Sequence, residues 1–247
     1  MTYIEPEMIV IQGGCFWMGN NDGPSIESPR HRVRLSTFQM ARYPVTRTEF
    51  QAFIDATDLP PPPWWDEPAF QGDRKPAIGI NWIEANDYCK WLSEVSGGCY
   101  RLPTEAEREC AARGGADDVV YPWGDALPQS HRGGRHQPVE EVGRQDGPNG
   151  FGLFDISGGV HEWCADFFGS DYYMISPEKN PGGPATGDRR VARGGAWRHA
   201  VRYARCAARS SLPPEKRFSD FGFRCAATDA QMSTQESAHD RSSIQEI

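Results

Sequence analysis

The alternation of hydrophobic and polar residues predicts β-structure near both ends of the chain. Residues 8–20, MIVIQGGCFWMGN, indicate two strands joined at a glycine-containing turn. Residues 31–45 alternate apolar and polar side chains in the manner of a strand. Residues 220–228, DFGFRCAAT, indicate a final strand. These three segments are the strands that we expect from the pattern alone.

Three further segments have the spacing of amphipathic helices, namely residues 46–57, 81–98 and 103–115. Each begins at a residue that caps helices well: Thr46, Asn81 or Thr104. A glutamate three positions after Thr46 and after Thr104 completes the pattern of a capping box. Glycines follow the second and third segments, as they do where helices end.

Helical spacing stops after residue 115. Residues 116–192 consist mostly of Gly, Pro, Asp and aromatic residues, and a loop stretch of that length is typical of a functional region or one pinned by an ion. The sequence contains no internal repeat, so we expect one domain over residues 1–228. The polar tail, residues 229–247, is expected to be disordered.

Charge and hydropathy narrow the class of protein. The formal net charge of −8 argues against a nucleic-acid binder that is held by phosphate contacts. The sequence has no apolar run of membrane-spanning length, and its first residues lack the basic start and apolar core of a signal peptide. We therefore expect a cytoplasmic protein whose partners include neither nucleic acid nor membrane.

The seven cysteines include no CxxC pair, and their odd number without a signal peptide favours reduced thiols. Cys89 and Cys225 stand in apolar settings and are expected to be buried neighbours, bonded or not. Cys206 stands among three arginines, which could lower its pKa. A nucleophilic thiol would also need a base and an oxyanion site, and the sequence identifies neither. A structural Cys206 is therefore favoured.

The segment DISGGVHEW carries a candidate calcium site. Asp155 and Glu162 are hard oxygen ligands seven residues apart, and Gly158 and Val160 could add backbone carbonyls. The alternative is a capped turn that leads into a strand anchored by the tryptophan. The six histidines form no zinc-like pair with cysteine and no His-x-x-x-His motif. We therefore expect His161 and His199 either at the surface or as groups that support the ligands of a site without binding the ion themselves.

Residues 193–210, RGGAWRHAVRYARCAARS, combine aromatic side chains with five arginines. Clusters of this kind recognise carboxylates and peptide backbones. The alternative for each single arginine is that it satisfies a loop carbonyl or a buried aspartate. The stretch lies after the long loops, where a site built from loops would draw its residues.

Several motifs together resemble one family. RLPTEAERECAARGG, YPWGD, NGFGLFDISGGVHEW, RVARGGAW and FGFRCA occur in this order. The chain is thereby similar, throughout residues 8–228, to the formylglycine-generating-enzyme (sulfatase-modifying factor) family. The resemblance implies a single α+β domain with a C-type-lectin-like core and little regular secondary structure.

The resemblance does not extend to the catalytic thiols. True formylglycine generators oxidise a substrate cysteine with two cysteines that bind copper. The matching interval here, AWRHAVRYAR at residues 196–205, contains no cysteine, and Val201 stands where the second thiol would fall. Copper is therefore not expected, because Cu(I) needs soft ligands. Cys206 matches a cysteine that is structural in the relatives.

The same resemblance supports one structural Ca²⁺ ion. Its ligands would correspond to the side chains of Asp155 and Glu162 and the carbonyls of Gly158 and Val160. A second calcium site of the family would lie between YPWGD and the VG at 142–143, where this sequence lacks the expected ligands. We expect that second site to be absent.

The sequence leaves two main alternatives for the function of the protein. The first is a binding or accessory (maturation) module of the family, without the dithiol copper site, for a protein or peptide partner or a small molecule. Its ligand-binding residues would be Trp163, Trp197, Arg198, His199 and Arg202.

The alternative function is an oxidoreductase of the pyoverdine-maturation type, which also manages without the cysteine pair. The sequence identifies no catalytic residue for it; the candidates are His199 and Cys206, with His161 and Glu162 beside them. Convergence of the histidines within hydrogen-bonding reach would favour this function. A third possibility, formylglycine generation by a displaced thiol pair, would require oxidation of a CxPxR peptide with copper.

Overall fold

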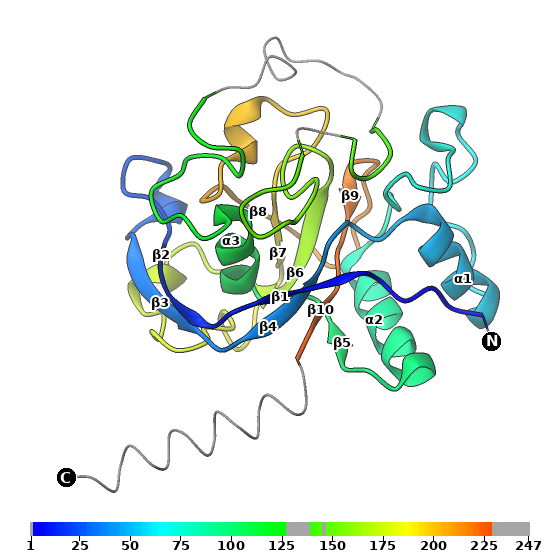
Figure 1. The fold of residues 1–247 in the computed structure, drawn as a ribbon, viewed down its shortest axis with the longest axis horizontal. Coiled ribbons are helices and arrows are strands. Elements are labelled where there is room, and N and C mark those ends of the chain that lie inside the picture. The colour runs from blue at the N-terminus through cyan, green and yellow to red at the C-terminus, as the bar shows by residue number, and fades with distance from the viewer. Residues whose placement is uncertain (1, 127–138, 145–146, 229–247) are drawn as a thin grey trace, which may run out of the picture.

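The structure is a computed structural model that describes residues 2–126, 139–144 and 147–228. The tail at 229–247, for which the sequence predicts disorder, lies outside the described residues, and so does most of the region of the second family calcium site. Figure 1 shows short strands and three helices held together by long irregular connections. This is the α+β architecture with little regular secondary structure that the sequence predicts.

Two four-stranded sheets and a two-stranded ribbon form the β-structure. The first sheet has the order β1 (Met8–Ile11), β4 (Phe38–Ala41), β10 (Ala226–Ala227), β5 (Tyr100–Arg101), all antiparallel. The ribbon pairs β2 (Gly14–Met18) with β3 (His31–Leu35). The second sheet has the order β8 (Arg209–Leu212), β7 (Arg190–Arg193), β6 (His161–Phe167), β9 (Phe221–Gly222), in which β6 and β9 run parallel.

All three helices that the sequence predicts are present. They are α1 (Arg47–Thr57), α2 (Trp82–Ser96) and α3 (Glu105–Arg113). A complete capping box starts each one, because the cap side chain accepts from the backbone of the third residue and the glutamate there reaches back. Gly97 and Gly114 end α2 and α3 in the left-handed conformation that glycine adopts at little cost. Among the described residues there are also four short 3-10 turns: Ser25–Glu27, Pro68–Phe70, Tyr172–Met174 and Val201–Ala204.

The largest core cluster joins α1 and α2 to the end of the chain. Phe50, Tyr88 and Phe223 are almost wholly buried, and the Phe50 ring lies 5.8 Å from Tyr88 and 6.2 Å from Phe223 between centroids. Aromatic rings at such separations add to the stabilisation from burial alone. A sequence-distant aromatic group therefore fixes the two helices against the C-terminal strands.

Buried ion pairs surround α3 and connect it to other parts of the chain. Glu105 accepts hydrogen bonds from Arg193 and Arg209, and Glu109 pairs with Arg113 and Arg193. Buried charges of this kind persist in proteins only when they are paired and hydrogen-bonded. Arg193 at the end of β7 and Arg209 at the start of β8 thus hold two strands of the second sheet to α3.

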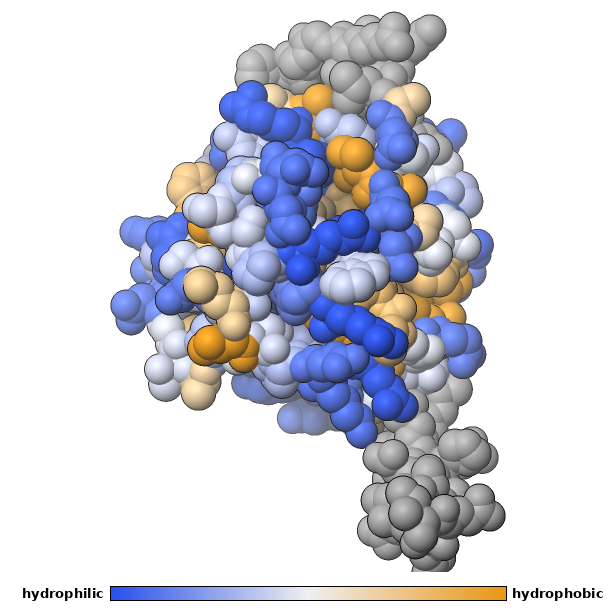
Figure 2. Space-filling model, turned by 90° about the vertical axis from the view of Figure 1, so that its left-hand side faces the viewer, coloured by the Kyte–Doolittle hydropathy of each residue, from blue (hydrophilic) through white to orange (hydrophobic). Residues whose placement is uncertain are grey.

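The strand prediction was correct in outline and incomplete in detail. Residues 31–45 form two strands rather than one, and the final segment splits into β9 and β10. Strand β6 and most of β7 lie within residues 116–192, where the sequence suggested loop, and β8 was not predicted. Their residues do not alternate clearly because both faces are buried: His161, Glu162 and Asp166 are polar but inaccessible. Within the described residues, no helix has both the length and the apolar character needed to cross a membrane. The face of the molecule shown in Figure 2 carries hydrophilic residues beside several groups of hydrophobic residues.

Candidate functional site

Three side chains from distant parts of the sequence converge next to β6. The Nε2 atom of His161 lies 3.0 Å from Nδ1 of His199, and Nε2 of His199 lies 3.3 Å from Oδ2 of Asp220. One potential ligand atom from each residue falls within 4.8 Å of the others. Imidazole and carboxylate groups so arranged can relay a proton or hold a metal ion. We call these three residues the His–His–Asp cluster.

Two members of the cluster are positioned by paired strands. His161 opens β6, and its backbone N–H donates to the carbonyl of Asp220 at 2.8 Å, immediately before β9. The His161 ring also stacks on Phe221, with 4.7 Å between centroids. His199 comes instead from the loop after β7, where its N–H donates to Ala196 O at 2.8 Å. The cluster therefore has two rigidly held members and one on a loop.

Burial governs the electrostatics of the cluster. Asp220 is fully buried, and Arg198 donates to its Oδ1 at 2.6 Å. Burial, followed by the charge on neighbouring groups, lowers the pKa of His161 to about 3, and burial also lowers the pKa of His199. His161 is therefore a neutral imidazole at physiological pH. Its Nδ1 atom and Oδ2 of Asp220 are buried without a hydrogen-bond partner among the described residues.

The His–His–Asp cluster was predicted from the sequence only in part. His199 was a candidate for both functions, and His161 was expected at the surface or behind other ligands, whereas it is 4 % exposed and contacts His199 directly. Asp220 was not singled out. Its position next to β9 becomes informative only once β9 pairs with β6, and no local pattern signals that pairing.

The predicted ligand-binding residues divide between surface and core. Trp197, Arg198 and His199 are partly exposed and Arg202 is exposed, so all four are accessible on the loop of residues 196–205. Trp163 requires a correction. It is completely buried, and its indole N–H donates to Ile80 O at 2.9 Å, so it belongs to the core rather than to a ligand surface.

The predicted calcium ligands do not fit the ion at Glu162. Both carboxylate oxygens of this fully buried residue are taken by guanidinium groups: Arg108 donates to Oε2, and Arg224 donates to both oxygens, each at 2.8 Å. Burial alone would raise the pKa of Glu162, but these two charges lower it. A Ca²⁺ ion would add a third cation to a carboxylate that already has two.

The other proposed ligands lie on the turn before β6. Asp155 Oδ2 accepts from the Gly143 N–H at 2.6 Å, Gly158 has a φ of 86°, and Val160 is buried in a small apolar cluster. These residues are consistent with the alternative interpretation, a hydrogen-bonded turn that leads into a strand.

Calcium is consequently expected to have no effect on stability. An ion that binds only the folded chain raises the melting temperature, and its removal lowers it. With Glu162 held by two arginines, melting temperatures in EGTA and in saturating CaCl₂ should agree to within about 1 °C. Thermal unfolding followed by circular dichroism tests this. A clear rise with CaCl₂ but not with MgCl₂ would restore the calcium site.

The three cysteines that the sequence singles out are all buried. Cys206 is 3 % exposed, and burial raises its pKa to about 12, which corrects the idea that nearby arginines could lower it. Two of those arginines pair elsewhere, since Arg205 binds Glu27 and Arg209 binds a buried glutamate of α3. The Sγ atoms of Cys89 and Cys225 lie 3.9 Å apart as free thiols in the core, as neighbours but unbonded.

The fold and these buried networks define the class to which the chain belongs. The α+β fold is that of a C-type-lectin-like, sulfatase-modifying-factor domain, and it matches the structure of PvdO from Pseudomonas aeruginosa with a TM-score of 0.79. That match covers 91 % of this chain and 95 % of PvdO at 28 % identity. The family model described as the sulfatase-modifying factor enzyme 1-like domain matches residues 2–229. The chain belongs to this family.

Two sequence relatives show the range of proteins that contain this domain. The formylglycine-generating enzyme of Thermomonospora curvata is 34 % identical, and the match covers 89 % of this chain and 93 % of that enzyme. The serine/threonine-protein kinase pkn1 of Chlamydia pneumoniae is also 34 % identical over 89 % of this chain. The chain spans only 38 % of the length of pkn1.

Proposed function

We propose that this chain is a binding or accessory module for maturation within the sulfatase-modifying family, and that it works without thiol chemistry. Its ligand is a carboxylate-bearing peptide, protein or small molecule. The observation that supports this function is the loop of residues 196–205. In place of cysteines, this loop presents the exposed side chains of Arg202 and Tyr203, together with partly exposed Trp197, Arg198 and His199.

Arg202 is the side chain best placed to meet an anionic ligand. It is exposed, its guanidinium lies 4.8 Å from the centroid of the Tyr203 ring, and the described residues offer it no carboxylate within salt-bridge distance. Arginine stacked on an aromatic ring keeps its donors free for a planar carboxylate.

The relationship to pkn1 also supports an accessory role. The match covers most of this chain but little more than a third of a protein whose name is that of a kinase. A domain of this family therefore accompanies other segments in that protein. In the present chain, the scaffold of this family lacks cysteines in the loop of residues 196–205, and such a scaffold suits recognition of a partner.

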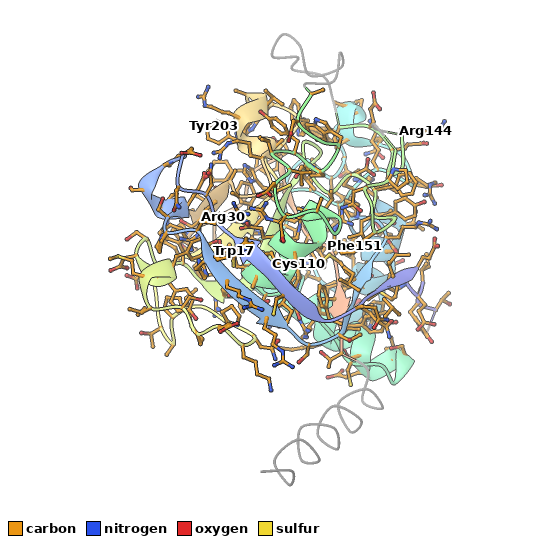
Figure 3. All side chains as sticks on the ribbon, turned by 60° about the vertical axis from the view of Figure 1, so that its left-hand side comes forward. Trp17, Arg30, Cys110, Arg144, Phe151 and Tyr203 are labelled. Atoms are coloured by element: carbon orange, nitrogen blue, oxygen red, sulfur yellow. The ribbon has the colours of Figure 1, made fainter. Side chains whose placement is uncertain are left out.

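Peptide binding tests the proposal. A fluorescent Glu-rich peptide should bind the purified protein more tightly than a Lys-rich peptide of equal length, despite the net charge of −8. Changing Arg202→Ala should weaken binding of the Glu-rich peptide about tenfold, as loss of a central arginine contact does. Arg144→Ala is the matched control, because Arg144 is also exposed and lies far from Tyr203 in Figure 3.

Two results would contradict the binding function. One is an equal effect of the Arg202 and Arg144 substitutions, since a general charge effect would then explain the binding. The other is conversion of a CxPxR peptide to an aldehyde when copper is supplied, because that reaction needs reactive thiols. Fluorescence anisotropy and mass spectrometry of the peptide distinguish these outcomes.

A second candidate function, catalysis without thiols, is supported by a different observation. The 3.0 Å approach of His161 to His199 is the convergence expected of groups that transfer protons. Asp220 would orient the accessible imidazole from its other side. An activity that is lost on His199→Ala but retained on Cys206→Ser would support this candidate over pure binding.

A further inference from the structure

We propose that the His–His–Asp cluster binds one divalent first-row transition-metal ion, of the zinc or iron(II) class. Ligand atoms that share such an ion lie about 2.0–2.2 Å from it and therefore ~3 Å or slightly more from one another. The His161 and His199 nitrogens are 3.0 Å apart, and the full set falls within 4.8 Å. His199 faces His161 through Nδ1 and Asp220 through Nε2, so binding by all three residues requires the side chains to rearrange around one nitrogen of His199.

A buried polar atom of the cluster that lacks a hydrogen-bond partner points to a bound group that the protein itself does not supply. Oδ2 of Asp220 is fully buried and faces His199, yet it accepts no hydrogen bond from the described residues. Nδ1 of His161 also has no partner among these residues, but it lies across the ring from the Nε2 atom that faces His199, so an ion at the cluster would not satisfy it. A buried acceptor without a partner typically costs about 1–3 kcal/mol, and in native proteins it usually indicates a water or an ion.

The donor set determines which ion fits. Two imidazoles with one carboxylate suit Zn²⁺, Fe²⁺ and their neighbours, whereas Ca²⁺ and Mg²⁺ prefer oxygen ligands and Cu(I) prefers sulfur. Three protein ligands leave at least one position for water or substrate, as at catalytic rather than structural zinc sites. His199 is partly exposed, so such a position would open toward the loop of residues 196–205.

The surroundings of the cluster meet the usual requirements of a metal site. His161 and Asp220 are fixed by the pairing of β6 with β9, and rigid elements hold ligands more precisely than loops. Arg198 binds the other oxygen of Asp220 at 2.6 Å and so orients the carboxylate from outside, as outer hydrogen bonds do around metal ligands. Its positive charge weakens the attraction for a cation, which favours a moderate affinity.

The metal site and the proposed peptide surface share the loop of residues 196–205, but the two proposals are tested at different residues. Its ligands are His161, His199 and Asp220, whereas the peptide proposal depends on Arg202. The protein with Arg202→Ala should bind metal normally, and the protein with Asp220→Asn should keep its preference for the Glu-rich peptide. Failure of one proposal is thereby distinguished from failure of the other.

The experiment is a titration of metal-free protein with ZnCl₂ by calorimetry, and with CoCl₂ by visible absorption. Both are done on a background with Cys15→Ser and Cys99→Ser, because these two thiols are exposed. We expect about one equivalent of either ion, with Co²⁺ bands of a site that contains nitrogen ligands. His199→Ala should weaken Zn²⁺ binding at least ~100-fold, since loss of outer partners alone costs 10–100-fold.

His31→Ala is the matched control, because His31 is only partly exposed and lies outside the cluster. It should leave Zn²⁺ affinity unchanged. His199 is on a partly exposed loop, so its variant should fold; circular dichroism checks this, and His161→Gln provides a second loss of affinity. Zn²⁺ binding that is absent in the parent protein, or equal in the parent and the His199 variant, would overturn the proposal.

Discussion

Replacing Glu162 by glutamine is expected to lower the free energy of unfolding by about 3–5 kcal/mol. The substitution removes the one negative charge between Arg108 and Arg224, which are 1 % and 0 % exposed. Two guanidinium groups would then remain buried without a counter-charge, in contact with an amide that can accept only part of their hydrogen bonds.

Urea unfolding of the parent and variant measures this effect. Glu178→Gln is the control, because Glu178 faces Arg32 across 3.6 Å at the surface, where both side chains are about 60 % exposed. Such a surface pair contributes at most about 1 kcal/mol. Failure of the Glu162 variant to fold agrees with the prediction. A loss below ~1 kcal/mol at both positions would show that the buried pairs do not stabilise the chain.

Replacing Asp166 by asparagine is expected to stabilise the protein at alkaline pH. Asp166 is 4 % exposed, and burial together with the charge of Glu105 raises its pKa from 3.8 to about 8. No salt bridge reaches it among the described residues, and its Oδ2 accepts the Glu105 N–H at 2.8 Å. The folded chain thus prefers the protonated carboxyl, which asparagine imitates.

The direction in which stability changes with pH follows from the raised pKa of Asp166. The carboxyl stabilises the folded state fully below about pH 4, and this contribution is lost progressively as the pH rises to about 8. The variant should therefore match the parent near pH 4 and exceed it by on the order of 6 kcal/mol above pH 8, since each pKa unit corresponds to about 1.4 kcal/mol. Urea unfolding across this range, with the exposed Asp188→Asn as control, gives the difference curve. A flat curve would contradict the raised pKa.

Helix prediction succeeded because its signals are local. Thr46, Asn81 and Thr104 satisfy backbone N–H groups within their own first turn, so four consecutive residues contain the necessary chemistry. Strands β6, β7 and β8 were missed because their pattern depends on partners elsewhere. Glu162 is tolerated inside β6 only because Arg108 and Arg224 reach it from 54 and 62 residues away.

The candidate site was predictable only in part, for the same reason. The loop of residues 196–205 could be recognised from its arginine and aromatic content, and His199 with it. The partners His161 and Asp220 stand 38 residues before His199 and 21 after it, and only the β6–β9 pairing brings them together. Trp163 was assigned to the ligand surface because an aromatic residue beside a histidine gives no sign of which face it occupies.

The order of strands in the first sheet limits how this protein can be made. Its third strand, β10, is inserted between β4 and β5 although it comes last among the described strands. All residues up to Ala227 must therefore leave the ribosome before that sheet closes, and contacts between such distant residues form slowly. A nascent chain that stops at Phe223 would expose the edges of β4 and β5 and would depend on chaperones until synthesis resumes.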